Sequence, residues 1–254
     1  MDVIVLAGGK STREDPLYEM APDGLKSLVN IAGKPMVQWV LDALSDAKLV
    51  ESVVVIGIDE ANNLHCKKEI AFLKDEGSLI SNIQQGCKYF DRIHPQNTHV
   101  VTISADIPTL TAEIIDQSIE MYQKYDLDVC YTVLDRAVME KRFPNSKRTY
   151  VKIKDGDVCG GDLNYIRKKA VLHPAGLWEQ LIKNRKNPLK QAFLIGIDTL
   201  VLMALRRLTL DDAAKRVCKR LGITGKAVRS PFAEIGMDVD KPFQFEIVEK
   251  DLLR

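Results

Sequence analysis

A glycine pair near the start of the chain is followed at once by two cations and two hydroxyl side chains, in the order Ala7-Gly8-Gly9-Lys10-Ser11-Thr12-Arg13. Glycine lets a backbone turn sharply and approach a ligand closely. Backbone N–H groups at such a turn bind phosphate, and neighbouring cations neutralise its charge. The segment therefore predicts a phosphate-binding loop, with an ordinary glycine turn as the alternative.

Two common phosphate-binding motifs do not fit this loop. The P-loop requires a glycine at the position that Ile4 occupies. The dinucleotide fingerprint G-x-G-x-x-G requires spaced glycines, whereas Gly8 and Gly9 are adjacent and no third glycine follows in register.

Asp106 is a candidate ligand for a metal that accompanies phosphate, because it follows an apolar segment and precedes Ile107-Pro108. Carboxylates at the carboxyl end of a buried strand suit Mg²⁺, which binds oxygen ligands and triphosphate together. A turn cap is the alternative for Asp106. We expect Asp240 to be the N-cap of a helix that begins at Lys241.

These residues need elements that bring them to one edge of a sheet. Residues 3–6 and 52–58 are apolar and β-branched, and a helical pattern runs from Pro35 to about Ser45 between them. Together they predict a βαβ unit with loop 7–13 at a strand's carboxyl end, where open α/β sheets bind ligands. Further strands are predicted at 99–104 and 128–134.

The second half of the chain has a different pattern. Residues 150–153 and 157–160 predict a hairpin around Asp155-Gly156. Residues 165–225 are mostly helical in pattern, and 228–235 returns to extended structure. The apolar segment Phe193–Leu205 is interpreted as part of a buried helix pair or, alternatively, as a dimer contact, so that a monomer and a homodimer both fit.

The longer motif resembles a known family. Leu6-Ala7-Gly8-Gly9-x-Ser11-x-Arg13, then Lys26, then Ile31-Ala-Gly-Lys-Pro-Met36 is similar to the signature of the MobA-like NTP transferases with a GT-A type fold. The resemblance implies an α/β Rossmann-like, three-layer α/β/α fold with a mostly parallel central sheet and a helical insertion in the C-terminal half. It also implies transfer of a nucleoside monophosphate from a nucleoside triphosphate to a phosphorylated small-molecule acceptor, with Mg²⁺ as cofactor and release of pyrophosphate.

The same resemblance divides the single domain 1–254. Residues 1–135 form the nucleotide-binding half, 136–225 the acceptor-binding or lid region, and 226–254 the return to the sheet and a closing helix. The resemblance is clear over 1–135 and 226–250 and only architectural between them. Glu14–Leu25 is an unusual acidic, proline-containing segment.

Site residues follow from the resemblance. Arg13 is expected to stabilise the leaving pyrophosphate, Lys26 to contact the α-phosphate region, and Asp106 and Asp238 to hold the metal. Asp238 matches the second metal position of the family's closing motif, and sharing of the metal and capping roles between Asp238 and Asp240 is the alternative. The expected nucleotide-binding residues are Leu6, Ala7, Gly8, Gly9, Ser11, Arg13, Lys26, Asn82 and Gln85.

Two groups of these residues have structural alternatives. Asn82 and Gln85 are expected to read the base, while Ser81 or Asn82 could equally be a helix N-cap. Gly161, Asp162 and Asn164 are expected to line the acceptor pocket, while a tight turn would also explain the glycine.

Composition limits the partners and the compartment. The chain has 254 residues and a net charge of +1, which favours neither nucleic acid nor an anionic membrane as a partner. The first residues lack the basic segment of a signal peptide. Five widely spaced cysteines without a C-x-x-C pair predict free thiols in the cytoplasm.

Two other function classes fit the sequence less well. A glycosyltransferase of the same fold would need Asp-x-Asp after the central strand, where the chain reads Ser104-Ala105-Asp106. A non-catalytic regulatory protein would be expected to lose the loop cations or the aspartates, and both are present.

Overall fold

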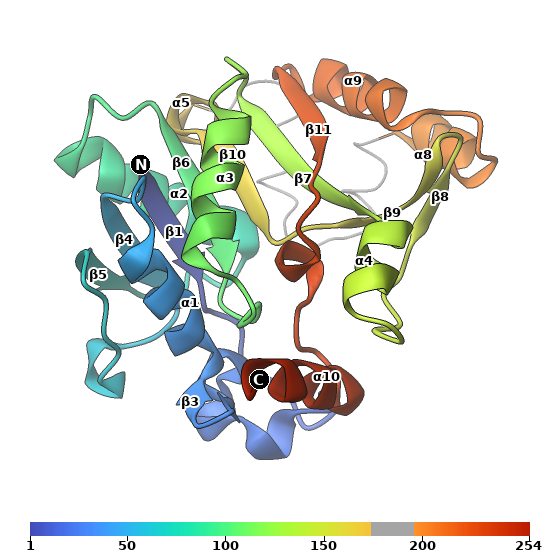
Figure 1. The fold of residues 1–254 in the computed structure, drawn as a ribbon. Helices are drawn as coiled ribbons and strands as arrows, with labels where there is room; N and C mark the ends of the chain where they lie inside the picture. The colour runs from blue at the N-terminus through green and yellow to red at the C-terminus, as the bar shows by residue number, and fades with distance from the viewer. Residues whose placement is uncertain (174–195) are drawn as a thin grey trace.

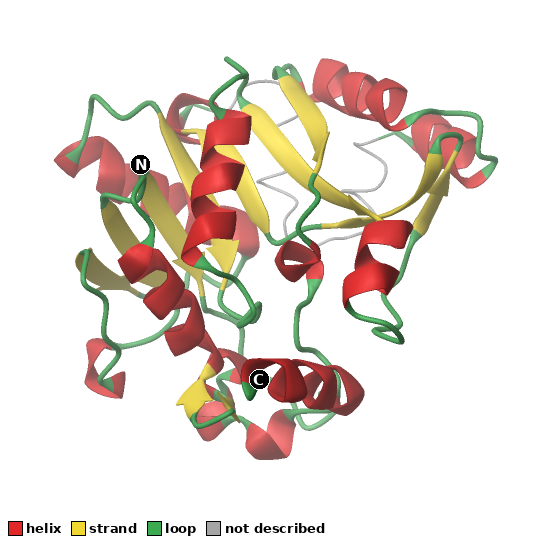
Figure 2. Cartoon of the chain, viewed as in Figure 1, coloured by secondary structure: helices red, strands yellow, loops and turns green. Residues whose placement is uncertain are grey.

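A nine-stranded sheet runs through the chain in the computed structural model, which describes residues 1–173 and 196–254 (Figures 1 and 2). Its order is β5-β4-β1-β6-β10-β7-β9-β8, and β11 pairs with β7. The strands are β1 (Asp2–Leu6), β4 (Ser52–Ile56), β5 (Glu69–Leu73), β6 (His99–Ser104), β7 (Val129–Asp135), β8 (Val151–Ile153), β9 (Gly156–Gly160), β10 (Leu163–Arg167) and β11 (Gly225–Arg229).

The first four strands of this order are parallel and in register. Leu6 pairs with Ile56 on β4 and with Ser104 on β6. The loops that leave β1, β4 and β6 therefore begin at the same edge of the sheet, as the sequence predicts. Strand β10 is antiparallel to both β6 and β7, so it joins the parallel strands to the second half of the chain.

Alternating side chains of β1 enter two separate core layers. Val3 and Val5 pack with α1 (Met36–Asp46) and α3 (Ala112–Tyr122). Ile4 packs on the other face with α2 (Leu79–Ile93) and α5 (Lys168–Leu172). Both faces of the sheet are thus covered by helices, which confirms the predicted three-layer α/β/α architecture.

The remaining helices surround the second half of the sheet and its lower edge in Figure 1. Helix α10 packs with residues of the Leu17–Met36 region in one apolar cluster. The C-terminal helix therefore covers this N-terminal segment. The helices are α4 (Arg136–Arg142), α8 (Ile197–Ala204), α9 (Leu210–Leu221) and α10 (Pro242–Leu252), with a separate two-strand ladder of β2 (Asn30–Ile31) and β3 (Lys34–Pro35).

Several local features depend only on residues close together in the sequence. The Thr111 and Thr209 side chains cap α3 and α9, and Gly222 ends α9 in the left-handed conformation. The predicted hairpin is present as β8 and β9, which pair antiparallel across Asp155-Gly156.

Other predictions are wrong in detail. Ser78, rather than Ser81 or Asn82, is the N-cap of α2. The extended segment ends at Arg229, and a 3-10 helix (Ala233–Gly236) replaces the predicted strand at 233–235. Strand β5 was not predicted at all, and part of the predicted helical block, including 177–182, lies outside the described residues.

Within residues 1–173 and 196–254, no helix is both long enough and apolar enough to cross a membrane. All five cysteines are free thiols, as expected from their spacing.

Candidate nucleotide site

A pocket of about 460 Å³ opens where β1 and β6 end. Loop 7–11 forms one wall and the turn after β6 forms another, and three further segments, 15–17, 26–27 and 240–241, complete the lining. The lining residues are Leu6, Ala7, Gly8, Gly9, Lys10, Ser11, Asp15, Pro16, Leu17, Lys26, Ser27, Ser104, Ala105, Asp106, Asp240 and Lys241. The predicted phosphate loop and the predicted aspartate after β6 therefore share one pocket.

The centre of this pocket is an ion cluster of Lys26, Asp106 and Asp240. The Lys26 ammonium lies 2.5 Å from Oδ2 of Asp106 and also pairs with Oδ1 of Asp240. The Ser104 hydroxyl donates to the other oxygen of Asp106 at 2.5 Å. Two carboxylates from distant parts of the chain thus converge on one positive charge.

The protonation state of Lys26 follows from this contact. Burial alone would lower the pKa of Lys26, but the carboxylates of Asp106 and Asp240 outweigh burial and raise it. The ammonium is therefore charged throughout the physiological pH range, and it is available to neutralise a phosphate group.

Asp238 does not occupy the position that the motif predicts. Its carboxylate pairs with Arg148, and it is not among the residues that line the pocket. The backbone N–H of Val239 donates to the carbonyl of Asp106 at 3.0 Å. This bond fixes the position of Val239, and the next residue, Asp240, lines the pocket.

Asp240 is also not the helix cap that was predicted. Lys241 is the N-cap residue of α10, without a side-chain capping bond. The Asp240 backbone N–H donates to Oε1 of Gln244 at 3.0 Å, and the Asp240 carboxylate remains available to the pocket.

Loop 7–13 is held by the segment 24–27. The Ser27 hydroxyl donates to the carbonyl of Ala7 at 2.9 Å, and the Ser11 N–H donates to the carbonyl of Gly24 at 2.7 Å. Lys10 lines the pocket, whereas Arg13 is exposed and is not among the lining residues. The structure therefore places Lys10, rather than Arg13, beside Lys26 in the pocket wall.

Asn82 and Gln85 lie behind the loop instead of in the pocket. Asn82 donates to Oδ1 of Asp75 at 2.9 Å and accepts from the N–H of Glu76 at 2.8 Å, while Gln85 donates to Glu76 at 3.1 Å. The Asn82 bond, with the backbone N–H groups of Gly77 and Gly9, lowers the pKa of Asp75. Both side chains thus position segment 75–77, which in turn contacts the glycine loop.

Two of the three predicted acceptor residues have structural roles. Asn164 accepts from the N–H of Thr132 at 2.8 Å and donates to the carbonyl of Gly161 at 3.2 Å, so its amide is engaged with the backbone. A Cβ at Gly161 would lie 2.9 Å from Thr132 and 3.0 Å from Ile235, so packing requires the glycine.

Asp162 is the third of these residues, and its environment is unusual. Burial, reinforced by the Asp106 carboxylate, raises the pKa of Asp162 to about 7, against the opposing effect of Arg148. Its Oδ2 is buried and has no hydrogen-bond partner. An unpaired polar atom at this depth is costly, and its burial is the main reason for the raised pKa.

The chain is similar to known proteins. The family model of the MobA-like NTP transferase domain matches residues 3–224. The chain belongs to the MobA-like NTP transferase family. A probable molybdenum cofactor guanylyltransferase of Thermococcus sibiricus (strain DSM 12597 / MM 739) is 24% identical over 129 residues, which is 50% of this chain and 58% of that protein. The match thus spans little more than half of that relative.

The chain is also similar to solved structures. A hypothetical transferase structure from Thermus thermophilus has 31% identity and a TM-score of 0.80, covering 96% of this chain and 98% of the other. The 4-diphosphocytidyl-2C-methyl-D-erythritol synthase of Anaerococcus prevotii DSM 20548 has 12% identity and a TM-score of 0.61, covering 100% and 96%. CMP:2-keto-3-deoxy-manno-octonic acid synthetase, solved with CTP, has 14% identity and a TM-score of 0.58, covering 99% and 97%. The last two share the fold.

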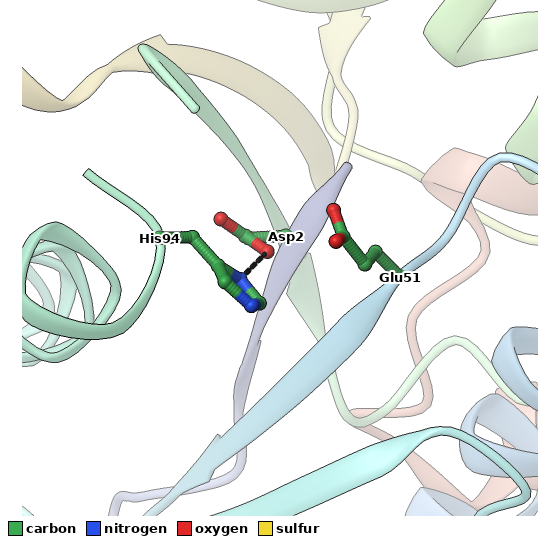
Figure 3. A group of neighbouring side chains, drawn as sticks. All are labelled: Asp2, Glu51 and His94. Atoms are coloured by element: carbon green, nitrogen blue, oxygen red, sulfur yellow. Dashed lines mark hydrogen bonds and ion pairs between the residues drawn. The ribbon is translucent and has the colours of Figure 1, made fainter. Parts of the chain in front are cut away.

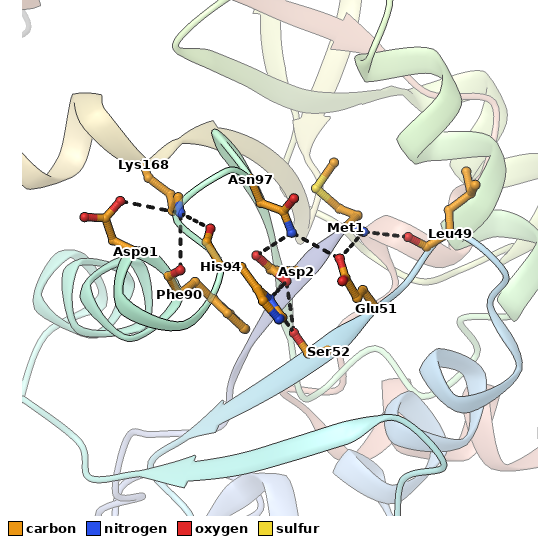
Figure 4. Close-up of polar contacts among 10 residues, drawn as sticks. All are labelled: Met1, Asp2, Leu49, Glu51, Ser52, Phe90, Asp91, His94, Asn97 and Lys168. Carbon is orange, nitrogen blue, oxygen red and sulfur yellow. Dashed lines mark hydrogen bonds and ion pairs between the residues drawn. The ribbon is translucent and has the colours of Figure 1, made fainter.

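A second cluster of potential metal ligands lies at the opposite end of β1 in this MobA-like domain. Asp2, Glu51 and His94 each offer one ligand atom within 4.8 Å of the others (Figure 3). Asp2 is completely buried and accepts hydrogen bonds from Ser52 and Asn97, and its Oδ1 lies 2.8 Å from His94 Nδ1 (Figure 4). Because its oxygens are already engaged and the cluster is remote from loop 7–11, we assign it a structural role.

The sequence does not give the roles of two residues at or near the nucleotide pocket: Asp240, which pairs with Lys26, and Arg148, which pairs with Asp238. Asp240 and Asp238 are two positions apart in an extended segment and have the same motif context, so the sequence does not distinguish them. Arg148 lies outside every motif and carries no local signal of its own.

Proposed function

We propose that this chain transfers a nucleoside monophosphate from a nucleoside triphosphate to a phosphorylated small-molecule acceptor and releases pyrophosphate. The observation that carries the proposal is the convergence of Asp106, Asp240 and Lys26 beside the glycine loop in one pocket. The 31% identical transferase from Thermus thermophilus and the CTP-bound and diphosphocytidyl relatives of the same fold support it.

The reaction is an in-line substitution at phosphorus. A phosphate oxygen of the acceptor forms a bond to the α-phosphorus, while the bond from that phosphorus to the α,β-bridging oxygen breaks and pyrophosphate takes the electron pair. An acceptor phosphate is ionised at neutral pH, so the step requires no general base. Such a transfer depends on positioning and on neutralisation of charge.

The donor set fits a divalent cation. Asp106 and Asp240 already direct oxygens at one positive charge, and oxygen ligands of this kind suit Mg²⁺. We therefore place the metal on Asp106 and Asp240, with Asp240 in the role that the motif alone would give to Asp238. When bound, the cation would neutralise charge on the phosphate oxygens.

The residues of the chain itself bind and orient the triphosphate. Gly8, Gly9 and Ser11 form the wall that faces the β- and γ-phosphates in this proposal, and Lys10 adds a positive charge there. Lys26 moves from its two carboxylate partners to the α-phosphate region. Arg13, which is exposed, reaches the leaving pyrophosphate only if loop 7–13 closes on the nucleotide.

The experiment compares three carboxamide variants of the full chain. We expect Asp106→Asn and Asp240→Asn each to lower Mg²⁺-dependent nucleotide turnover by about a hundredfold, since each removes a ligand charge from the reacting phosphates. Asp238→Asn should have a much smaller effect. Pyrophosphate release with a panel of phosphomonoesters measures turnover, and thermal shift with the four ribonucleoside triphosphates identifies the base.

The controls separate the two assignments of the metal. Full activity of Asp240→Asn together with loss in Asp238→Asn would reverse our assignment. Stabilisation of the native protein by none of the four Mg²⁺–nucleotides would contradict the proposed function itself.

A further inference from the structure

The charges that line the nucleotide pocket balance one another. Three ammonium groups and three carboxylates face it, those of Lys10, Lys26, Lys241, Asp15, Asp106 and Asp240. A divalent cation that entered alone would leave positive charge in excess, whereas a cation that entered with a triphosphate would bring its own counter-charge. The lining therefore favours a cation that arrives together with an anion.

The two carboxylates that we assign to the metal are already engaged by donors of the chain itself. The Lys26 ammonium lies 2.5 Å from Oδ2 of Asp106 and also pairs with Oδ1 of Asp240. The second oxygen of Asp106 accepts a hydrogen bond from the Ser104 hydroxyl at 2.5 Å. A metal ion held by both aspartates would have to replace the ammonium, because two cations on the same oxygens repel each other.

The backbone of Lys26 is fixed beside the glycine loop, but its side chain can move. The next residue, Ser27, is buried and its hydroxyl donates to the carbonyl of Ala7, while the preceding residue, Leu25, forms a bridge with Lys10. The Lys26 side chain is a flexible four-carbon stem and is 28% exposed. Rotation of this side chain alone can therefore take the ammonium from the carboxylates to an anion on the loop.

We propose that Lys26 blocks the Asp106–Asp240 metal site in the nucleotide-free protein and leaves it when phosphate groups bind loop 7–11. This inference rests on the proposed function for the identity of the anion as a nucleoside triphosphate. The phosphate groups attract the ammonium, and its departure makes both carboxylates available to the cation. Metal and nucleotide therefore bind together, and each raises the affinity of the protein for the other.

Binding of Mn²⁺ without nucleotide tests the block, since Mn²⁺ takes the same oxygen ligands as Mg²⁺ and is paramagnetic. We expect Lys26→Met to bind Mn²⁺ about tenfold or more tightly than wild type, because the site is no longer blocked in most molecules. Lys26→Arg keeps the charge that pairs with both carboxylates, so its Mn²⁺ affinity should stay close to that of wild type. Electron paramagnetic resonance of the free ion measures the three affinities.

Two further variants separate the block from a general effect of charge. Lys241→Met removes an ammonium group that lines the pocket but, within the described part of the chain, has no ion pair with either aspartate, so Mn²⁺ affinity should rise by only about twofold. Adding Asp240→Asn to Lys26→Met should abolish the gain, since it removes a ligand. An equal gain in Lys241→Met, or a gain that persists in the double variant, would overturn the inference.

Wild-type protein provides a test that needs no variant. We expect Mn²⁺ alone to leave the amide signals of residues 104–107 sharp, at a concentration that broadens them when a saturating, unreactive nucleotide analogue is present. Equal broadening with and without the analogue would contradict the block. Failure of the proposed function is a separate result: no nucleotide would then bind, while Mn²⁺ affinities of nucleotide-free wild type and Lys26→Met would still decide whether Lys26 blocks the carboxylates.

Discussion

At the scale of single residues, the glycine loop depends on a glycine outside its own motif. A Cβ at Gly57, which follows β4, would lie 2.2 Å from the Cα of Gly8. Gly57 also has φ of 103°, a conformation that side chains rarely adopt. The backbone of the loop after β1 thus rests directly on the backbone after β4, and neither side has room for another atom.

We expect Gly57→Ala to weaken Mg²⁺–nucleotide binding by about tenfold or more, because the added methyl group displaces the glycine loop. Gly33→Ala is the matched control, since Gly33 also has a positive φ of 90° but nothing lies within 4 Å of its Cβ position. Both variants share the backbone strain of roughly 1 kcal/mol, so their difference isolates the contact. Equal nucleotide affinity of the two variants, by titration calorimetry, would argue against this role.

At the scale of elements, residues 14–25 are a packed part of the domain. The segment contains the 3-10 turns Tyr18–Met20 and Pro22–Gly24. Its last residue, Leu25, forms an isolated antiparallel bridge with Lys10, which precedes the segment. Leu17 is 1% exposed and joins the apolar cluster that includes Val29, Met36 and Phe143. The acidic segment that looks like an insertion in the sequence is therefore anchored by one leucine.

We expect Leu17→Ala to lower the free energy of unfolding by about 3 kcal/mol, as large-to-small substitutions in a core do. Met20→Ala is the control, because Met20 is 43% exposed and its substitution should cost much less. Chemical denaturation of both variants measures the difference. A Leu17→Ala protein as stable as wild type would mean that the segment is not anchored in this way.

At the scale of the whole molecule, a buried acid links stability to pH. Burial, with the Asp106 carboxylate, raises the pKa of Asp162 to about 7, whereas an unfolded aspartate titrates near 4. Between these pH values the unfolded chain has released a proton that the folded chain keeps. Stability is therefore lost as pH rises from about 4 to 7, and no more is lost above that range.

Asp162→Asn removes this titration from the nucleotide-free protein. Relative to wild type, the increase in the free energy of unfolding of the variant should be roughly 3 kcal/mol larger at pH 8 than at pH 5. Urea denaturation at the two pH values tests this. A variant that differs from wild type by the same amount at both would show that Asp162 does not carry the effect.

The sequence alone determined the elements that bring loop 7–11 and Asp106 together. β-branched apolar runs specify buried strands, and apolar residues at helical spacing specify the helix between the first two. Because these strands are parallel, loop 7–11 and Asp106 follow strand ends at the same edge of the sheet. Helix caps such as Thr111 and Thr209 are equally local, because a hydroxyl three residues before an N–H needs no tertiary partner. The family signature lies within these local patterns.

Tertiary structure alone decided which carboxylate joins Asp106. Asp238 and Asp240 are chemically identical and two residues apart, and the choice depends on one long-range bond from Val239 to the Asp106 carbonyl. It also decided that Asn82 supports the loop through Asp75, that Asn164 binds backbone, and that Arg148 pairs with Asp238. These roles depend on contacts between residues distant in the chain, and no periodicity or spacing along the sequence encodes such contacts.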